Sequence, residues 1–173
     1  MTRILCLWLP NWPIQRITRS QPELKSRAVV LEAPGQRGSR VAACCAAAAG
    51  QGGRVDMPVA AARALVRRLA VTRHDPAADA RELRRLAAAC ERFSPCVALE
   101  EGDEPESLLL DITNLTHLLG SEAELAAKME QFFAAEGYRT QMAVAETVGL
   151  AWAVAHFGDW GLGAGGSRNQ ARL

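Results

Sequence analysis

Six consecutive apolar residues near the N-terminus, residues 4–9, constrain the fold of this chain more than any other feature. The run is too short to cross a bilayer, and it is typical of a β-strand that is buried on both faces. We therefore expect the fold to be built around a central sheet to which this strand belongs.

Alternating strand and helix patterns follow this run, separated by capping and turn signals. Asn11 can cap a helix that tolerates Pro13 in its first turn, and Ser121 with Glu124 forms a capping box for a helix that Gly137 ends. The expected strands are 4–9, 28–31, 40–44, 71–74, 97–99, 108–110 and 141–145, and the expected helices are 12–20, 46–49, 59–69, one from 76, 121–136 and 148–157.

The order of these elements predicts an α/β (α+β) fold of the ferredoxin-like, split βαββαβ type, with an insertion after its first helix. We expect helices on one face of the sheet and the 97–110 hairpin at its centre. The main domain would comprise 1–24 and 70–157, the insertion would be a small helical lobe at 25–69, and 158–173 would be a flexible glycine-rich tail. Many unrelated proteins share this arrangement, so the fold alone predicts no activity.

Composition narrows the function classes. The formal net charge of +1 supplies almost no attraction to nucleic acid, so any such contact would come from a local basic face. The five cysteines contain no CxxC pair and the three histidines are far apart, which argues against a zinc site. Cysteines within apolar segments are typical of buried thiols in a reducing cytosol. We expect a cytoplasmic protein with no cofactor, no metal and no membrane association.

Four segments, in order, resemble the Y-family of translesion DNA polymerases (UmuC/DinB-like) and, within it, the catalytically inactive ImuB-type members. They are ILCLWLPNWPIQR from residue 4, the stretch 41–65 around Asp56-Met57-Pro58, FSPCVALEEGDEPESLLLDITNLTHLLG from residue 93, and AVAETVGLAWAVA from residue 143. The resemblance extends to about Phe157. It implies a palm-like domain at 1–24 and 70–157 and a fingers-like lobe at 25–69, with the thumb and little finger absent.

The resemblance also implies where an active polymerase would hold its two metal ions, which carboxylates from separate strands bind. The two aspartates of the first strand correspond here to Trp8 and Pro10. The Asp-Glu pair that precedes the LDIT sequence at 110–113 corresponds to Glu106 and Ser107. Only Glu106 keeps a carboxylate, and hard cations need several oxygen ligands.

The positions that would hold the triphosphate are replaced as well. By resemblance, a tyrosine and an arginine of the fingers correspond to Ala46 and Ala49, and a lysine of the palm corresponds to Trp152. None of the three can hold a phosphate. Trp8, Trp12 and Trp152 either cluster where the metals and triphosphate would lie or fill separate core positions.

The resemblance thus implies a non-catalytic scaffold in error-prone translesion synthesis. Its implied partners are an error-prone replicative-type polymerase, a RecA-like accessory protein and the sliding clamp. Two alternatives remain: a weakly active nucleotidyltransferase that uses Glu106, and an unrelated ferredoxin-like binding module. Arginines of the lobe are candidate DNA contacts, although arginine on alanine-rich helices is often only solubilising. They are Arg37, Arg40, Arg54, Arg63, Arg67 and Arg68.

Overall fold

The computed structural model describes residues 1–115 and 120–158, and the chain divides into two compact units. The first unit contains Met1–Pro10 and the chain from Leu83 onward, and the second contains Asn11–Glu82. The boundaries therefore fall at 10/11 and 82/83, whereas the sequence led us to expect 24/25 and 69/70. The predicted flexible tail, from residue 159 on, lies outside the described residues.

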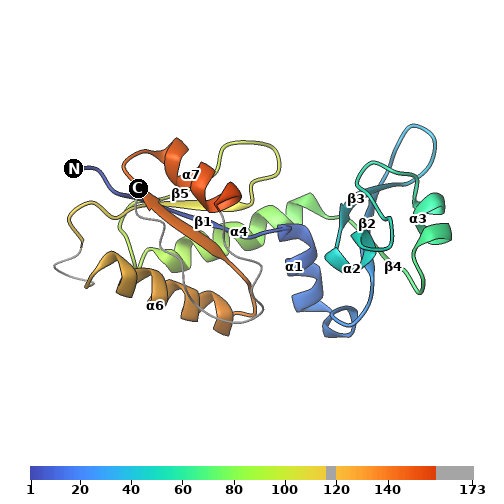
Figure 1. Ribbon diagram of the computed structural model, residues 1–173, viewed down its shortest axis with the longest axis horizontal. Coiled ribbons are helices and arrows are strands. Elements are labelled where there is room, and N and C mark those ends of the chain that lie inside the picture. The colour runs from blue at the N-terminus through green and yellow to red at the C-terminus, as the bar shows by residue number, and fades with distance from the viewer. Residues whose placement is uncertain (116–119, 159–173) are drawn as a thin grey trace. The chain divides into compact units, whose positions relative to one another are not determined.

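The first unit is built on a four-stranded antiparallel sheet with the order β5-β6-β1-β7 (Figure 1). Strand β1 lies between β6 and β7 and is antiparallel to both. This is the strand order of the split βαββαβ, ferredoxin-like fold, which confirms the predicted fold class. The predicted hairpin is not central, because β5 is an edge strand. The strands are β1 (Ile4–Trp8), β5 (Val97–Leu99), β6 (Ser107–Asp111) and β7 (Gln141–Ala145).

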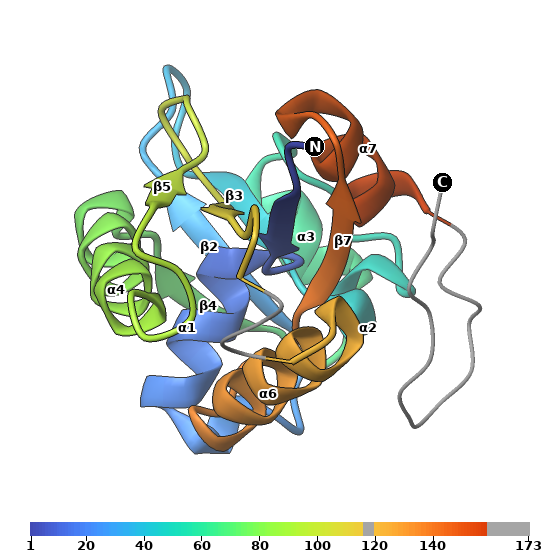
Figure 2. The same cartoon turned by 90° about the vertical axis from the view of Figure 1, so that its left-hand side faces the viewer.

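Helices cover both faces of this sheet, which corrects the expectation of a single covered face. Helix α7 (Val148–Phe157) lies on one face and α6 (Glu122–Ala135) on the other (Figures 1 and 2). The reason lies in β1: Leu5 and Leu7 are fully buried on one side, and Cys6 is fully buried on the other, against α7. A strand without a polar face needs cover on both sides. Helix α6 begins at the predicted capping box of Ser121, whose two hydrogen bonds are both present.

The second unit has a three-stranded sheet of its own, so the predicted helical lobe is in fact a mixed α/β unit. Strand β2 lies between β3, which is antiparallel to it, and β4, which is parallel. Ile14 and Ile17 of α1 share a core cluster with Leu31 of β2 and Ala70 of β4. Helix α1 and strand β4 thus belong to this unit, which accounts for its boundaries. Its elements are α1 (Trp12–Ser20), η1 (Pro22–Leu24), β2 (Val29–Ala33), β3 (Arg40–Cys44), α2 (Ala46–Ala49), α3 (Val59–Leu65), β4 (Ala70–Arg73) and the start of α4 (Pro76–Cys90).

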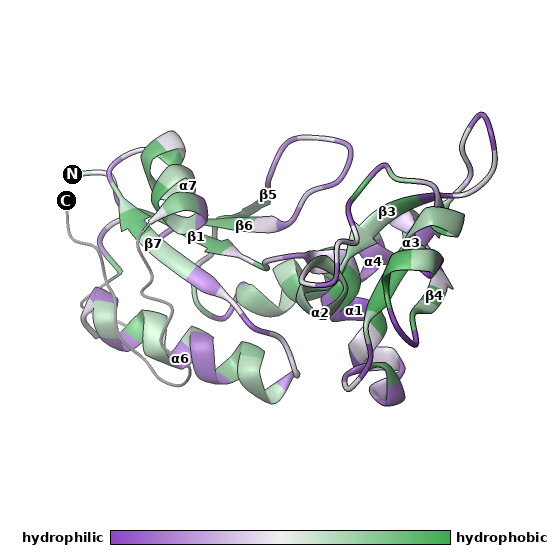
Figure 3. Cartoon of the chain, turned by 45° about the vertical axis from the view of Figure 1, so that its right-hand side comes forward, coloured by the Kyte–Doolittle hydropathy of each residue, from purple (hydrophilic) through white to green (hydrophobic). Residues whose placement is uncertain are grey.

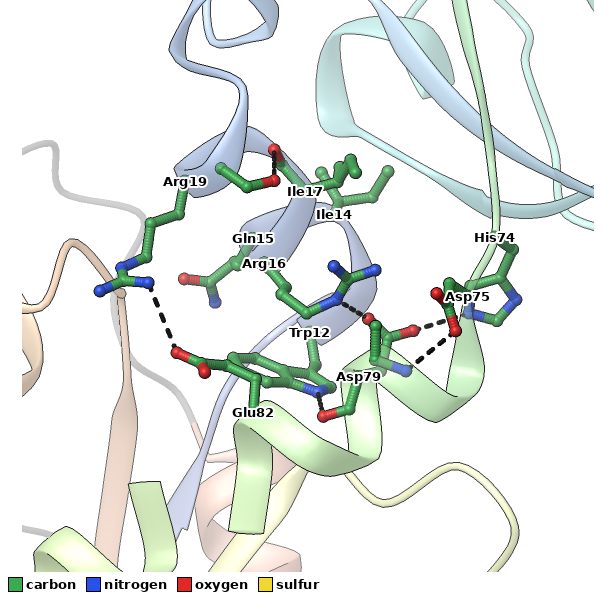
Figure 4. A network of polar contacts seen from close by, with 12 residues as sticks. Trp12, Ile14, Gln15, Arg16, Ile17, Arg19, His74, Asp75, Asp79 and Glu82 are labelled. Carbon is green, nitrogen blue, oxygen red and sulfur yellow. Dashed lines mark hydrogen bonds and ion pairs between the residues drawn. The ribbon is translucent and has the colours of Figure 1, made fainter. Parts of the chain in front are cut away.

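A buried polar network ties α1 to β4 and α4 within the second unit (Figure 4). The Asp79 carboxylate accepts one hydrogen bond from Arg16 Nε and another from His74 Nε2, the latter at 2.9 Å. Trp12 Nε1 donates to the backbone carbonyl of Asp79 at 3.2 Å. Asp79 is only 6% exposed, so these donors replace the water that its charge has lost.

Two helix ends of the second unit differ from expectation. Asn11 occupies the N-cap of α1 but has a left-handed φ of 56°, and its side chain makes no cap bond. Its Nδ2 donates instead to the carbonyl of Cys44 at 2.8 Å. Helix α3 ends at Leu65, before the predicted Leu69, because Val66 is already extended.

In residues 1–115 and 120–158, no helix has both the length and the apolar character that a bilayer crossing requires. The five cysteines are all free thiols.

Candidate functional site

Small residues let helix α7 approach the sheet closely. Ala151 and Ala155 are fully buried in a cluster with Cys6 and the β7 residue Ala143. Trp152 and the residue four positions later, His156, follow these alanines on the helix and therefore project from one side of it. Both reach the end of β1.

The imidazole of His156 lies between two indole rings. Its centroid is 4.4 Å from the Trp8 ring and 4.1 Å from the Trp152 ring, and both pairs are stacked, with interplanar angles of 24° and 26°. A stacked aromatic pair contributes about 0.5–1.5 kcal/mol beyond the burial of its area. We call Trp8, His156 and Trp152 the aromatic stack.

Hydrogen bonds define the tautomer of His156. Nδ1 lies 2.9 Å from the carbonyl oxygen of Trp152, which can only accept, so Nδ1 carries the hydrogen. In the neutral ring Nε2 is then an acceptor, and the hydroxyl of Ser107 donates to it at 3.3 Å. Ser107 is fully buried and lies opposite Trp8 in the pairing of β6 with β1. The first residue of β6 therefore holds the aromatic stack against the sheet.

Two carboxylates accept the indole N–H groups of the stack. Glu106 Oε2 is 3.1 Å from Trp8 Nε1, and Glu100 Oε1 is 2.6 Å from Trp152 Nε1. The second oxygen of Glu100 accepts the backbone N–H of Glu106 at 3.1 Å. Both oxygens of Glu100 and one oxygen of Glu106 are thus already hydrogen-bonded within the protein.

The surroundings of the buried groups beneath the stack disfavour negative charge. Burial, and then the charge of Glu100, raise the pKa of the Cys6 thiol to about 12, although a hydrogen bond with Ser107 lowers it. Gln141 lies opposite Trp8 in the pairing of β7 with β1, and its buried Oε1 has no hydrogen-bond partner. The site is therefore apolar and acidic.

These side chains do not fit a pair of divalent cations. Such a pair needs several carboxylate oxygens that converge from separate strands, whereas β1 ends here in an indole that is bonded to Glu106. Across the described part of the chain, no three His, Cys, Asp or Glu side chains are placed to hold a metal ion.

The structure brings together four of the positions that the sequence singled out, namely Trp8, Glu106, Ser107 and Trp152. Pro10 follows β1 by two residues and is the last residue of that segment of the first unit.

The remaining predicted positions lie in the second unit. Ala46 and Ala49 are exposed on α2, and Trp12 is buried there with its indole N–H on Asp79. Of the three tryptophans that could have clustered, Trp8 and Trp152 form the stack. The six candidate DNA-binding arginines are all exposed: Arg37, Arg40, Arg54, Arg63, Arg67 and Arg68.

Sequence reasoning missed three contributors to this site: His156, Glu100 and Gln141. The spacing of four residues between Trp152 and His156 on an expected helix was the available signal for His156. Glu100 lies in the turn of the expected 97–110 hairpin, where no pattern distinguished it, and none distinguished Gln141.

Residues 7–156 match the impB/mucB/samB family. The chain belongs to this family. Two proteins similar to this impB/mucB/samB domain are Protein ImuB of Caulobacter vibrioides strains NA1000 / CB15N and ATCC 19089 / CIP 103742 / CB 15. Each is 45% identical over 97 residues, which cover 56% of this chain and 20% of that protein. The match therefore spans about one fifth of the length of these curated relatives.

Solved polymerase structures share the fold of this impB/mucB/samB domain. The insertion ternary complex of Dbh DNA polymerase has a TM-score of 0.76 and 18% identity, over 89% of this chain and 45% of that chain. DinB from Sulfolobus solfataricus has a TM-score of 0.75 and 18% identity over the same shares. A Y-family DNA polymerase chimera, Dbh-Dpo4(243-245)-Dbh, has a TM-score of 0.76 and 17% identity, again over 89% and 45%. These likenesses confirm the resemblance to the Y-family at the level of the fold.

Proposed function

We propose that this chain is a non-catalytic, Y-family polymerase-like domain that serves as a scaffold or recruitment module in error-prone translesion DNA synthesis. The observation that carries this proposal is the aromatic stack. By resemblance, Trp8 stands at a metal-binding aspartate and Trp152 at a phosphate-binding lysine, and His156 fills the space between them.

The charges around the stack also favour this proposal. Phosphoryl transfer depends on preorganised positive charge around the triphosphate and on metal ions that neutralise it. The hydrogen bonds of the stack instead bring in two carboxylates, Glu100 and Glu106, and the Cys6 thiol beside them has a raised pKa. A triphosphate placed here would meet repulsion.

The biological setting is part of the same proposal. An error-prone replicative-type polymerase, a RecA-like accessory protein and the sliding clamp are the partners that the Y-family resemblance implies, and the cytoplasm is the compartment. The exposed arginines of the second unit are the candidate contacts to DNA.

A weakly active nucleotidyltransferase is the second candidate, because Glu106 keeps a carboxylate immediately before β6. Its Oε2 already accepts the indole N–H of Trp8, so a metal ion at that oxygen would compete with the indole. Membership of the impB/mucB/samB family removes the third candidate, an unrelated ferredoxin-like module.

Primer extension tests catalysis directly. The wild-type chain and the Glu106→Ala variant are incubated with primer-template, all four deoxynucleoside triphosphates and either Mg²⁺ or Mn²⁺, with a DinB-type polymerase as positive control. We expect no extension by either form. Incorporation by the wild type that Glu106→Ala abolishes would overturn the proposal in favour of the enzyme. Titration calorimetry with a deoxynucleoside triphosphate adds a second readout, in which micromolar affinity would also count against the proposal.

DNA contact is tested separately by the salt dependence of binding to a fluorescent primer-template. Neutralising Arg63, Arg67 and Arg68 should weaken binding and reduce the slope of log affinity against log salt by about one for each lost phosphate contact. Neutralising the exposed Arg81 and Arg84 of α4 is the matched control and should leave the slope unchanged. An unchanged slope in the first variant would remove these arginines from the DNA interface.

A further inference from the structure

Helix α7, VGLAWAVAHF, is predominantly apolar and carries no Asp, Glu, Lys or Arg, yet part of its apolar surface is open to solvent. Ala151 and Ala155 face the sheet, whereas Leu150 is 40% exposed and Phe157 is 77% exposed. An apolar helix surface is normally covered, so a second contact is expected on this side.

One side of α7 forms a stripe that is exposed at Gly149, Leu150 and Phe157 and half-buried at Ala153. Gly149, Leu150, Ala153 and Phe157 have the spacing of residues on one helix face, opposite the buried alanines. A Cβ atom added at Gly149 would meet no atom within 4 Å, so the helix backbone is approachable at that point. We call these four residues the outer stripe.

An acidic turn is bonded to the same helix. Residues 100–106, EEGDEPE, connect β5 to β6 and contain five carboxylates and no basic residue. Glu100 accepts the indole N–H of Trp152 on α7, which fixes the base of the turn to that helix. Glu101, Asp103 and Glu104 are exposed. Figure 3 shows the contrast: α7 is mainly hydrophobic, and the turn between β5 and β6 is mainly hydrophilic.

We propose that the outer stripe and the acidic turn form a docking surface for an amphipathic helix of a partner protein, with one apolar face and a flank of lysine or arginine. The apolar face would cover Leu150 and Phe157, as in helix-in-groove recognition, and the basic flank would meet the exposed carboxylates. This proposal goes beyond the proposed function, because it holds whether or not the aromatic stack has abolished catalysis.

Charge favours such a partner over a second copy of this chain. A second copy that met this surface through its own α7 would bring an uncharged helix and another acidic turn. Its five carboxylates would repel those already present. Only a basic flank gives Glu101, Asp103 and Glu104 an opposite charge.

Two synthetic helical peptides with the same leucine face provide the probe. One carries lysine along one flank, and the other carries glutamate at the same positions. We expect titration calorimetry to detect binding of the lysine peptide only, weakened when salt rises from about 0.05 to about 0.5 M because screening shortens the reach of charges. Equal affinity for both peptides, or for neither, would overturn the proposal.

Variants then locate the contact. Leu150→Glu should weaken the lysine peptide about tenfold, the loss expected for one buried apolar side chain. The double variant Asp103→Lys/Glu104→Lys should reverse the preference in favour of the glutamate peptide, a result that a folding defect cannot produce. Glu130→Lys, at an exposed position of α6, is the matched control and should change neither affinity. Failure of the preference to reverse would remove the acidic turn from the surface.

Self-association is checked by sedimentation velocity over a range of protein concentrations. We expect the wild type to remain monomeric. A dimer that Leu150→Glu dissociates would mean that a second copy occupies the outer stripe, which would overturn the assignment to a basic partner.

Discussion

Trp8 Nε1 lies 3.1 Å from Glu106 Oε2, so the residue that ends β1 holds the one carboxylate that the sequence retains at an expected metal-binding position. Trp8 ends β1, and Glu106 immediately precedes β6, the strand that pairs with β1 although it is distant in sequence. The remaining carboxylate, Glu106, thus accepts a hydrogen bond from the Trp8 indole.

His156→Ala should destabilise the protein by about 2–4 kcal/mol, because it removes two stacked ring pairs and leaves the buried Ser107 hydroxyl without its acceptor. Urea denaturation gives the free energy of unfolding. His156→Phe, which keeps an aromatic ring but no ring nitrogen, should lose less. Glu130→Ala is an exposed control that should stay within about 0.5 kcal/mol of wild type. An unchanged midpoint for His156→Ala would contradict the role of the stack in stability.

Gln141→Leu should leave stability unchanged or raise it by about 1 kcal/mol, because the buried Oε1 has no hydrogen bond to lose and its desolvation cost disappears. The same urea titration measures this. Gln141→Glu is the contrasting variant and should destabilise the protein, since it would place a charged carboxylate oxygen where the buried Oε1 has no hydrogen-bond partner. A marked loss of stability in Gln141→Leu would show that the amide has a partner after all.

Cys6 should resist alkylation in the folded protein. With its pKa raised to about 12, about one thiol in ten thousand is ionised at pH 8, and the thiolate is the nucleophile. The thiol is also fully buried. Iodoacetamide followed by peptide mass spectrometry should show rapid modification of the exposed Cys96 and none of Cys6 until urea is added. Modification of both at similar rates in the folded protein would contradict this.

Asp79→Asn should cost about 3 kcal/mol or more, because it leaves Arg16 and His74 buried without their shared negative partner. Asp103→Asn, in the exposed turn, is the matched control and should have little effect. A double-mutant cycle of Asp79→Asn with His74→Gln should show a coupling energy that differs from zero. Additive effects would mean that the two side chains do not depend on each other.

Acid should remove the stabilising effect of Asp111. Hydrogen bonds from the hydroxyl and backbone N–H of Thr113 lower the pKa of its carboxyl. A lowered folded-state pKa gives a contribution that is complete above the unfolded value of about 3.9 and is lost as the pH falls through the folded value. Wild type and Asp111→Asn should therefore differ in unfolding free energy at pH 7 and converge as the pH falls below the lowered folded-state pKa of Asp111. A difference that stays constant with pH would exclude this group.

Local signals were sufficient for much of the fold. The apolar run at 4–9 predicted a strand with two buried faces, and the Ser121 capping box predicted the start of α6. They were insufficient for features that depend on distant residues. Nothing near Ala70 indicates that β4 pairs in parallel with β2, and this pairing, together with α1, moves the unit boundary.

In the candidate site too, local sequence predicted some features, whereas others depend on distant residues. Counting along the sequence placed Trp8, Glu106, Ser107 and Trp152 at related positions, and the structure brings these four together. The identity of their neighbours depended on packing: His156 joins the stack because Ala151 and Ala155 let α7 lie close to β1. The bond from Trp152 to Glu100 likewise depends on the path of a turn that no periodic pattern describes.

The bond from Trp12 to the backbone of Asp79 bears on how the second unit could be inserted into the first during evolution. It fastens the opening turn of the second unit to its closing helix, a few residues from each end of Asn11–Glu82. A segment whose two ends meet can be added to a host chain, or exchanged for another, without the host strands having to find new partners. The Asp79 network therefore joins the two ends of the inserted segment 11–82. Replacing 11–82 with a short linker is a direct way to obtain the β5-β6-β1-β7 sheet on its own.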